Sequence, residues 1–314
     1  MAFENHSRTS RPRPLKRDAR DSDNSGMGRR WGGLSGLWTR LLCVAILCVS
    51  VVGCRSVSPN LADLPSKYEL ATSELLIRSD LKIKQNDPML EDLRNIRREL
   101  TETLRLPAPR RPVVIYLFSD EERYSTYMQA RHPNLPARRA FFIGSPTELG
   151  VYAHWSPNVG EDLRHEYTHG VLHASLRSVP LWLDEGLAEY YETQTDMPGR
   201  LHREHTQRLA IALKNGWRPD LARLEKIEEV SQMGRADYQE SWAWIHYLLN
   251  DAPDGRAILV DYCAELKSTS KPPRFAERLA KTFPDADQRL ASYITLSLTD
   301  HGRVSWASGV RESK

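Results

Sequence analysis

The pattern of apolar and polar positions divides the chain into a part with strand patterns and a part with helical patterns. Four short runs of apolar, β-branched and aromatic residues predict strands, and they fall at residues 70–79, 113–118, 139–143 and 149–155. Two stretches between them have apolar residues at helical spacing and predict helices over 88–105 and 120–131. From residue 160 onward the helical spacing continues, and it predicts helices over 160–176, 180–195, 200–215, 236–250, 254–267, 273–282 and 285–297. Strands followed by helices indicate an α+β fold, with a sheet-containing part at 67–158 and a helical part at 159–299.

The first 54 residues differ from the rest. Residues 1–26 are polar and are expected to be disordered, whereas residues 41–53 form an apolar run that is too short to span a bilayer as a helix. This run follows Arg29, Arg30 and Arg40 and ends in Gly53-Cys54, as in a secretory signal. Its end resembles the bacterial lipobox, in which the cysteine carries lipid and becomes the new N-terminus. We therefore expect an exported protein that is anchored to the membrane of the cell envelope through lipid on Cys54. A buried helix or an uncleaved anchor is the alternative.

The segments on either side of the predicted folded part are not expected to form regular structure. Residues 55–66 are polar and are expected to form a tether, and residues 300–314 a flexible tail. A start at Met27 would give the leader an ordinary length.

Composition and charge exclude several classes of protein. Of 314 residues, 40% are hydrophobic and 27% are charged, which excludes a polytopic membrane protein and a wholly disordered chain. Four cysteines exclude a disulfide-dense scaffold, and Cys263 lies in an apolar helical pattern that predicts a buried thiol. The net charge is +3, but residues 1–54 hold nine basic and four acidic residues. The remaining 35 basic and 37 acidic residues give −2, so we expect no nucleic-acid partner.

The chemically informative stretch is His165-Glu166-x-x-His169, which lies in a predicted helix. On a helix the two imidazoles lie about 40° apart in azimuth and about 6 Å apart along the axis, so both can reach one zinc ion. Glu166 projects about 100° further round, where it can act on a water molecule without binding the metal. A catalytic zinc needs a third protein ligand. The helix predicted after Pro180 offers Glu185, sixteen positions after His169.

The two helices together resemble a known group of enzymes. His-Glu-x-x-His followed by Trp-Leu-x-Glu-Gly-x-Ala, residues 182–188, is similar to the gluzincin metallopeptidases, the group of thermolysin and aminopeptidase N. Over residues 110–250 the chain looks closest to the peptidase MA-like family of bacterial proteins. The resemblance implies a zincin-like fold, in which a small twisted mixed sheet packs on the active-site helix and a helical half follows. It also implies that Zn²⁺ is held by His165, His169 and Glu185 in a cleft between the two parts. The spacing to Glu185 is a few residues shorter than in those enzymes, so the turn must be tight.

The resemblance implies two further roles. Tyr238 begins a segment that resembles one whose tyrosine hydroxyl stabilises the oxyanion in the aminopeptidase-like members, although a tyrosine packed at a helix start is the alternative. In zincins an edge strand just upstream of the active-site helix pairs with the extended substrate. The strand at 149–155, with Val151, Tyr152 and Ala153, occupies that place. It lacks the Gly-x-Met-Glu-Asn sequence of the aminopeptidases, which favours an endopeptidase.

Neighbouring side chains offer alternatives within the site. A third histidine on the helix, His173, lies about 12 Å along the axis from His165, too far to share one zinc ion, so a structural or supporting role is expected. Asp184 could replace Glu185 as the ligand, but the two project about 100° apart and only one can point inward. Glu189, one turn after Glu185, could accept a hydrogen bond from the far nitrogen of His165 and fix its tautomer, or be a solvated helix residue.

These observations give two hypotheses of function. In the first, the protein is a zinc metallopeptidase, and Glu166 takes a proton from the attacking water and passes it to the leaving amine of a peptide or protein substrate. In the second, it is a lipid-anchored binding or scaffold protein that keeps the zinc fold without turnover. Zinc hydrolysis of another amide, such as one in cell-wall peptide stems, is a third alternative.

Overall fold

The computed structural model describes residues 2–3, 63–73, 75–194 and 198–298. Most of the predicted leader and tether, with Cys54, and the predicted tail at 300–314 lie outside these ranges. Within them the fold is mixed α+β, as predicted, with the strands before the helical part. A search of the same ranges finds no helix with the length and apolar character needed to cross a membrane.

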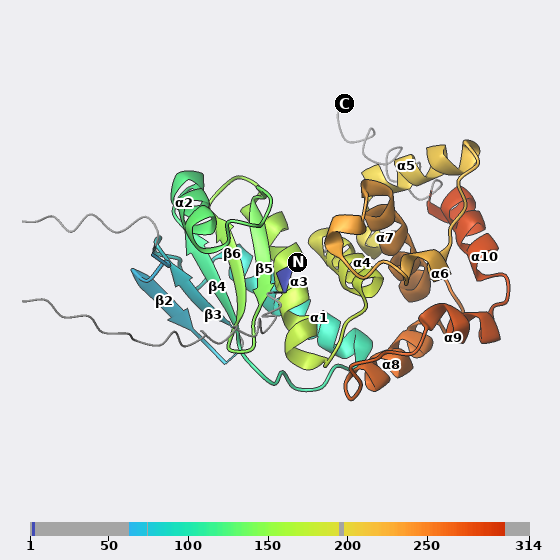
Figure 1. The fold of residues 1–314 in the computed structure, drawn as a ribbon, viewed down its shortest axis with the longest axis horizontal. Coiled ribbons are helices and arrows are strands. Elements are labelled where there is room, and N and C mark those ends of the chain that lie inside the picture. The colour runs from blue at the N-terminus through green and yellow to red at the C-terminus, as the bar shows by residue number, and fades with distance from the viewer. Residues whose placement is uncertain (1, 4–62, 74, 195–197, 299–314) are drawn as a thin grey trace, which may run out of the picture. The chain divides into compact units, whose positions relative to one another are not determined.

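The strands form one mixed sheet in the order β1-β5-β6-β4-β3-β2 (Figure 1). Its members are β1 (Ala2–Phe3), β2 (Tyr68–Ala71), β3 (Leu76–Ser79), β4 (Val113–Phe118), β5 (Ala140–Gly144) and β6 (Leu149–His154). Strands β3, β4 and β6 run parallel, while β2 and β5 are antiparallel to their neighbours. The single strand predicted over 70–79 is two strands. A turn divides them, in which the Thr72 hydroxyl accepts a hydrogen bond from the Leu75 amide at 2.9 Å.

The position of β6 corrects the predicted edge strand. Val151, Tyr152 and Ala153 are buried and pair with β4 on one side and β5 on the other, so their main-chain groups are not free for a substrate. The strand just before them, β5, folds back as a hairpin and takes the outer position. Its only pairing on the far side, among the described strands, is with two-residue β1 at Ile143 and Gly144. The main chain at 140–142 is therefore the open edge.

Helices cover both faces of the sheet. Strand β4 shows why: Ile115 and Leu117 point to one face, while Val114, Tyr116 and Phe118 point to the other. Helices α1 (Pro88–Leu104) and α3 (Val159–Ser175) bury their apolar sides on the first face, and α2 (Glu121–Arg131) covers the second. Gly170 lets α3 approach β4 closely, because a Cβ there would lie 2.7 Å from Val113 Cγ1.

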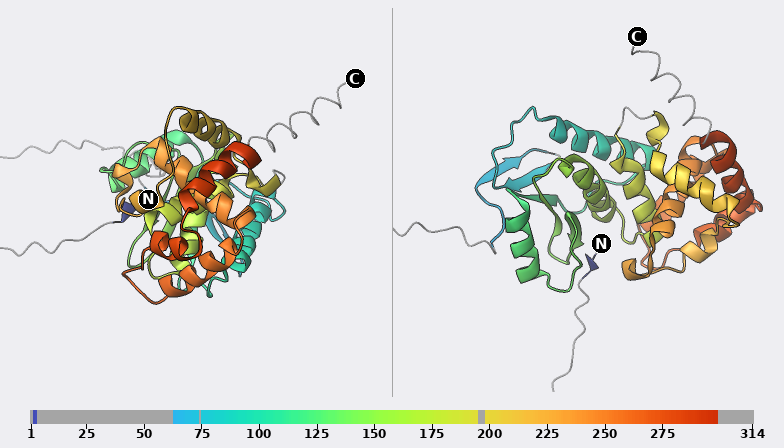
Figure 2. Two further views of the ribbon diagram at one scale, coloured as in Figure 1. Left: turned by 90° about the vertical axis from the view of Figure 1, so that its right-hand side faces the viewer. Right: turned by 90° about the horizontal axis from the view of Figure 1, so that it is seen from above.

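The rest of the described chain, drawn from yellow-green to red in Figure 2, is helical, and most of its elements contact α7. Its elements are α4 (Leu181–Glu192), η1 (Pro198–Arg200), α5 (Arg203–Lys214), α6 (Leu221–Leu224), η2 (Val230–Gln232), α7 (Arg235–Asn250), α8 (Gly255–Leu266), α9 (Phe275–Thr282), α10 (Ala286–Tyr293) and η3 (Ile294–Leu298). Trp182, Trp242 and Trp244 are fully buried in its core. Cys263 is a free, buried thiol, as predicted, and burial raises its pKa to about 12.

Helices α4 and α7 approach each other closely at Gly186. A Cβ at this position would lie 2.6 Å from the Ser241 carbonyl oxygen and 2.8 Å from the side chain of Ile245. The glycine therefore sets the distance of α4 from α7, and with it the position of the neighbouring Glu185.

Candidate metal centre

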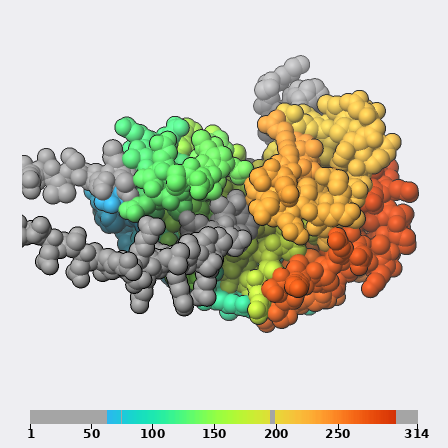
Figure 3. Space-filling view, viewed as in Figure 1, coloured from blue at the N-terminus to red at the C-terminus, as the bar shows by residue number. Residues whose placement is uncertain are grey.

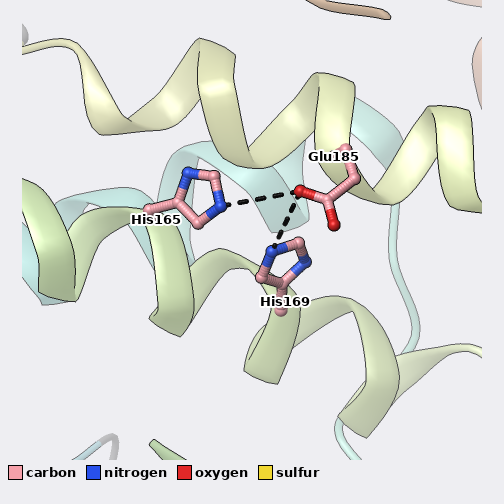
Figure 4. Close-up of side chains that lie close together, drawn as sticks. All are labelled: His165, His169 and Glu185. Carbon is pink, nitrogen blue, oxygen red and sulfur yellow. Dashed lines mark ion pairs between the residues drawn. The ribbon is translucent and has the colours of Figure 1, made fainter. Parts of the chain in front are cut away.

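Helices α3 and α4 bring His165, His169 and Glu185 together (Figure 4). Glu185 Oε2 lies 3.6 Å from His165 Nε2 and 3.7 Å from His169 Nε2. These separations are longer than hydrogen bonds. They are close to the roughly 3.3 Å expected between two ligands of a tetrahedral ion whose bonds are about 2.0–2.1 Å. The three side chains could therefore hold one metal ion.

Burial and hydrogen bonding support this fit. His169 and Glu185 are each only 1% exposed, and Glu185 Oε1 is buried without a hydrogen-bond partner in the described part of the chain. An unpaired buried carboxylate oxygen is costly, and a cation would satisfy it. Burial raises the pKa of Glu185, but the imidazoles of His169 and His165 outweigh this effect and lower it. The carboxylate is thus held in the ionised form that binds metals.

Asp184 fixes the orientation of His169. One of its oxygens lies 2.8 Å from His169 Nδ1 and the other 2.8 Å from His173 Nε2, and the side chain is fully buried. When His169 donates from Nδ1 to this carboxylate, its Nε2 is left free for a metal. His173 lies outside the ligand group and contacts the same carboxylate. Asp184 therefore supports the site, while Glu185 is the residue that faces both imidazoles.

Glu192, rather than the predicted Glu189, contacts the far nitrogen of His165. Glu192 Oε2 lies 2.9 Å from His165 Nδ1, whereas Glu189 Oε2 lies 2.7 Å from His205 Nε2. The helix period explains the difference. Glu192 is seven residues after Glu185 and returns to within about 20° of its direction, whereas Glu189 is rotated by about 40°. Burial raises the pKa of Glu192, but hydrogen bonds with His165 and His202 outweigh this effect and lower it to about 2.

Glu166 faces the sheet edge. Its Oε2 accepts a hydrogen bond of 2.6 Å from the Phe142 amide of β5, and the side chain is 7% exposed. The motif helix and the open strand edge therefore meet at this carboxylate. The strand at 139–143 was predicted, but the sequence analysis placed the open edge one strand later, at 149–155.

Tyr238 and Arg138 come to the same place from distant segments. Burial and the carboxylate of Glu185 raise the pKa of Tyr238, while Arg138 and His165 act in the opposite direction. Burial lowers the pKa of Arg138, but Tyr238, Glu166 and Glu185 outweigh this effect and raise the pKa overall. The Tyr238 hydroxyl is buried without a hydrogen-bond partner among the described residues, and Arg138 lines a cavity together with His165 and Glu166. The sequence analysis did not identify Arg138 as a site residue. Its only mark in the sequence is that it forms, with Arg139, a pair of arginines before an apolar strand.

Two cavities open beside these residues. One of about 270 Å³ is lined by His165, Glu166, Glu192 and Arg138. The other, of about 360 Å³, lies between α2, the loop before β5 and Phe141, and shares Arg138 with the first. In the space-filling view the surface is hollowed between the part drawn green and the part drawn yellow and orange (Figure 3). Together the cavities follow the start of β5.

Comparison with known proteins gives no family. No protein-family model matches the chain, and no curated protein matches it in sequence. Its function must therefore be argued from the site.

Proposed function

We propose that the protein is a zinc-dependent metallopeptidase of the gluzincin type that cleaves internal peptide bonds. One observation carries the proposal: His165, His169 and Glu185 converge on one point, with Glu166 beside them at the open edge of β5. The arrangement supplies metal ligands, a proton acceptor and a place for an extended chain within one cleft.

The ligand set suits zinc. Two imidazoles and a carboxylate are three ligands of the kind found in catalytic zinc sites, which leave a fourth position open. When bound, a zinc ion supplies Lewis acidity, which polarises a carbonyl group and makes water acidic near neutral pH. Asp184 and Glu192 hold the two imidazoles with their Nε2 atoms towards Glu185.

Glu166 is proposed to be the general base. It follows His165 directly, and the Phe142 amide orients its carboxylate. In this position it accepts a proton from the attacking water and delivers it to the leaving amine. Tyr238 and Arg138 offer a hydroxyl and a guanidinium to the oxygen of the attacked carbonyl, on which negative charge develops.

The substrate is proposed to bind along β5. Apart from the Phe142 amide, which donates to Glu166, the outward main-chain groups at 140–142 can pair with an extended peptide, and the adjoining cavities can receive its side chains. This pairing recognises the backbone rather than one terminus, in keeping with an endopeptidase.

Cleavage of a quenched peptide library by the purified zinc-loaded protein tests the proposal, with Glu166→Gln as the decisive variant. We expect Glu166→Gln to keep its zinc and to lose at least about a hundredfold in kcat/KM, because the general base is gone. Glu102→Gln, on the exposed side of α1, is the matched control and should retain full activity. Turnover retained by Glu166→Gln would contradict the assigned base. A wild-type protein that binds zinc and cleaves nothing would favour the alternative, a zincin-fold binding or scaffold protein.

A further inference from the structure

We propose that a second divalent transition-metal ion binds between α4 and the start of α5, held by Glu189, His202 and His205. One possible ligand atom from each of these residues lies within 4.8 Å of the other two. None of the three belongs to the group formed by His165, His169 and Glu185. The proposal does not depend on peptide cleavage.

The chain builds this cluster through the cap of α5. His202 is the residue before the helix, and its Nδ1 accepts a hydrogen bond of 3.2 Å from the His205 amide. Since Nδ1 is used by the backbone, Nε2 is the nitrogen left for a ligand, and it lies 3.4 Å from Glu192 Oε1. His205 stacks on His202, with ring centres 3.6 Å apart, and its Nε2 lies 2.7 Å from Glu189 Oε2. Both imidazoles therefore turn a nitrogen towards the carboxylates of α4.

The charges in this region favour a cation. Glu189 and Glu192 are largely buried carboxylates, with side chains 13% and 16% exposed, and their side-chain partners among the described residues are all histidines. Two arginines of the surrounding segments have other carboxylate partners. Arg164 pairs with Asp92, and Arg200 pairs with Glu99. Two carboxylates without an arginine or lysine partner need positive charge, which a proton or a metal ion must supply.

The donors of the cluster select a class of ion. Of the three proposed ligands, His202 lines a cavity of about 320 Å³, together with Glu192, Arg164 and Arg203. Two imidazole nitrogens with carboxylate oxygen suit zinc, nickel or copper, whereas calcium and magnesium prefer oxygen ligands alone. Glu192 contacts His165, and one possible ligand atom each of His165, Glu189 and Glu192 lies within 4.8 Å of the other two, so the proposed site adjoins the first centre.

Zinc stoichiometry of the purified protein, measured by elemental mass spectrometry after equilibration with micromolar zinc, tests the proposal. We expect two zinc ions per chain in the wild type. Both Glu185→Ala and the double variant His202→Ala, His205→Ala should bind one, and the combination of all three changes should bind none. His132→Ala, a histidine outside both groups, is the matched control and should bind two. One ion in both the wild type and the double variant would overturn the proposal and leave a proton as the cation in this cluster.

Further variants and a spectroscopic measurement distinguish the loss of a ligand from misfolding of the double variant. Glu189→Gln keeps the shape of the side chain and should also reduce zinc from two ions to one. In Glu185→Ala loaded with Co²⁺, visible absorption bands should remain, and they should disappear when His205→Ala is added. Millimolar Ca²⁺ should not displace the second ion, and displacement would contradict the assigned donor set. A protein that binds two ions without cleaving peptides would overturn the proposed function alone, and one that cleaves peptides with a single ion would overturn this proposal alone.

Discussion

A single buried carboxylate, Asp184, contacts two imidazoles at once. Its two oxygens face His169 and His173. Burial raises the pKa of Asp184, but the two histidines outweigh this effect and bring the pKa well below its ordinary range. The ionised carboxylate accepts a hydrogen bond from each ring. His169 is therefore held with Nε2 towards Glu185, and the site is oriented before a metal arrives.

Asp184→Asn tests this role. The amide can accept from one ring only through its oxygen, and its nitrogen faces the other ring as a donor, so the tautomer of His169 is no longer fixed. We expect zinc affinity at the first centre to fall by about 10- to 100-fold, measured by competition with a chromophoric chelator. Asp261→Asn, an exposed aspartate on α8, should leave the affinity unchanged. Equal affinities in the two variants would show that Asp184 does not orient His169.

At the scale of residues, the sequence predicted those parts of the candidate site whose residues are close together in the chain. His165, Glu166 and His169 lie within one helical turn and a half, so their spacing alone places them on one side of α3. The contact between Glu192 and His165 could not be predicted in this way, because it depends on how α4 crosses α3. Arg138 and the amide of Phe142 reach the site from another part of the fold, and their neighbours in the sequence give no sign of it.

At the scale of elements, the packing of α4 decides where Glu185 lies. Most boundaries of the predicted helices and strands agree with the structure, because caps and breakers mark them in the sequence. The order of strands does not have such local marks. Strands β5 and β6 are both short, apolar and buried, and β5 lies outside because β6 is the one that pairs with β4.

Gly186→Ala tests the close contact between α4 and α7. The added methyl group meets the Ser241 carbonyl oxygen at 2.6 Å, and a backbone atom cannot move aside as a flexible side chain can. We expect the free energy of unfolding, measured in urea, to fall by about 1–3 kcal/mol. Zinc affinity should fall with it, since Glu185 is the adjacent residue.

Gly160→Ala is the matched control on α3. Its Cβ would have no neighbour closer than 3.4 Å, so the better helix propensity of alanine should leave stability unchanged or raise it by up to about 1 kcal/mol. Similar losses in both variants would indicate that the effect at Gly186 is not steric.

At the scale of the whole molecule, one hydrophobic core connects the sheet with the helical part. It includes residues from Leu75, just before β3, to Ile294, the first residue of η3. The candidate metal centre lies where α3, packed on the sheet, meets α4, packed on α7. The predicted division at residue 158 is thus a change of secondary structure within one folded unit.

The predicted lipid anchor is tested by cell fractionation. When the full chain is expressed in a bacterium, we expect the protein in the membrane fraction and Cys54→Ser in the soluble fraction or retained as an unprocessed precursor. Lipidation would be read directly as a mass increase on the N-terminal peptide that begins at Cys54. Cys263→Ser is the control and should remain with the membrane. An unchanged distribution of Cys54→Ser would contradict the anchor.

The possible ligands of the first centre come from two helices, so metal binding there would be part of folding. In the proposed function, an ion held by His165, His169 and Glu185 would tie α3 to α4. Zinc at a hundred times its Kd, with no affinity for the unfolded chain, would then add about 2.7 kcal/mol to the free energy of unfolding. We expect a chelator to lower the melting temperature of the wild type and to change that of Glu185→Ala much less, by differential scanning calorimetry. In a compartment where free zinc varies, the amount of this protein that survives proteolysis would then follow the supply of the metal.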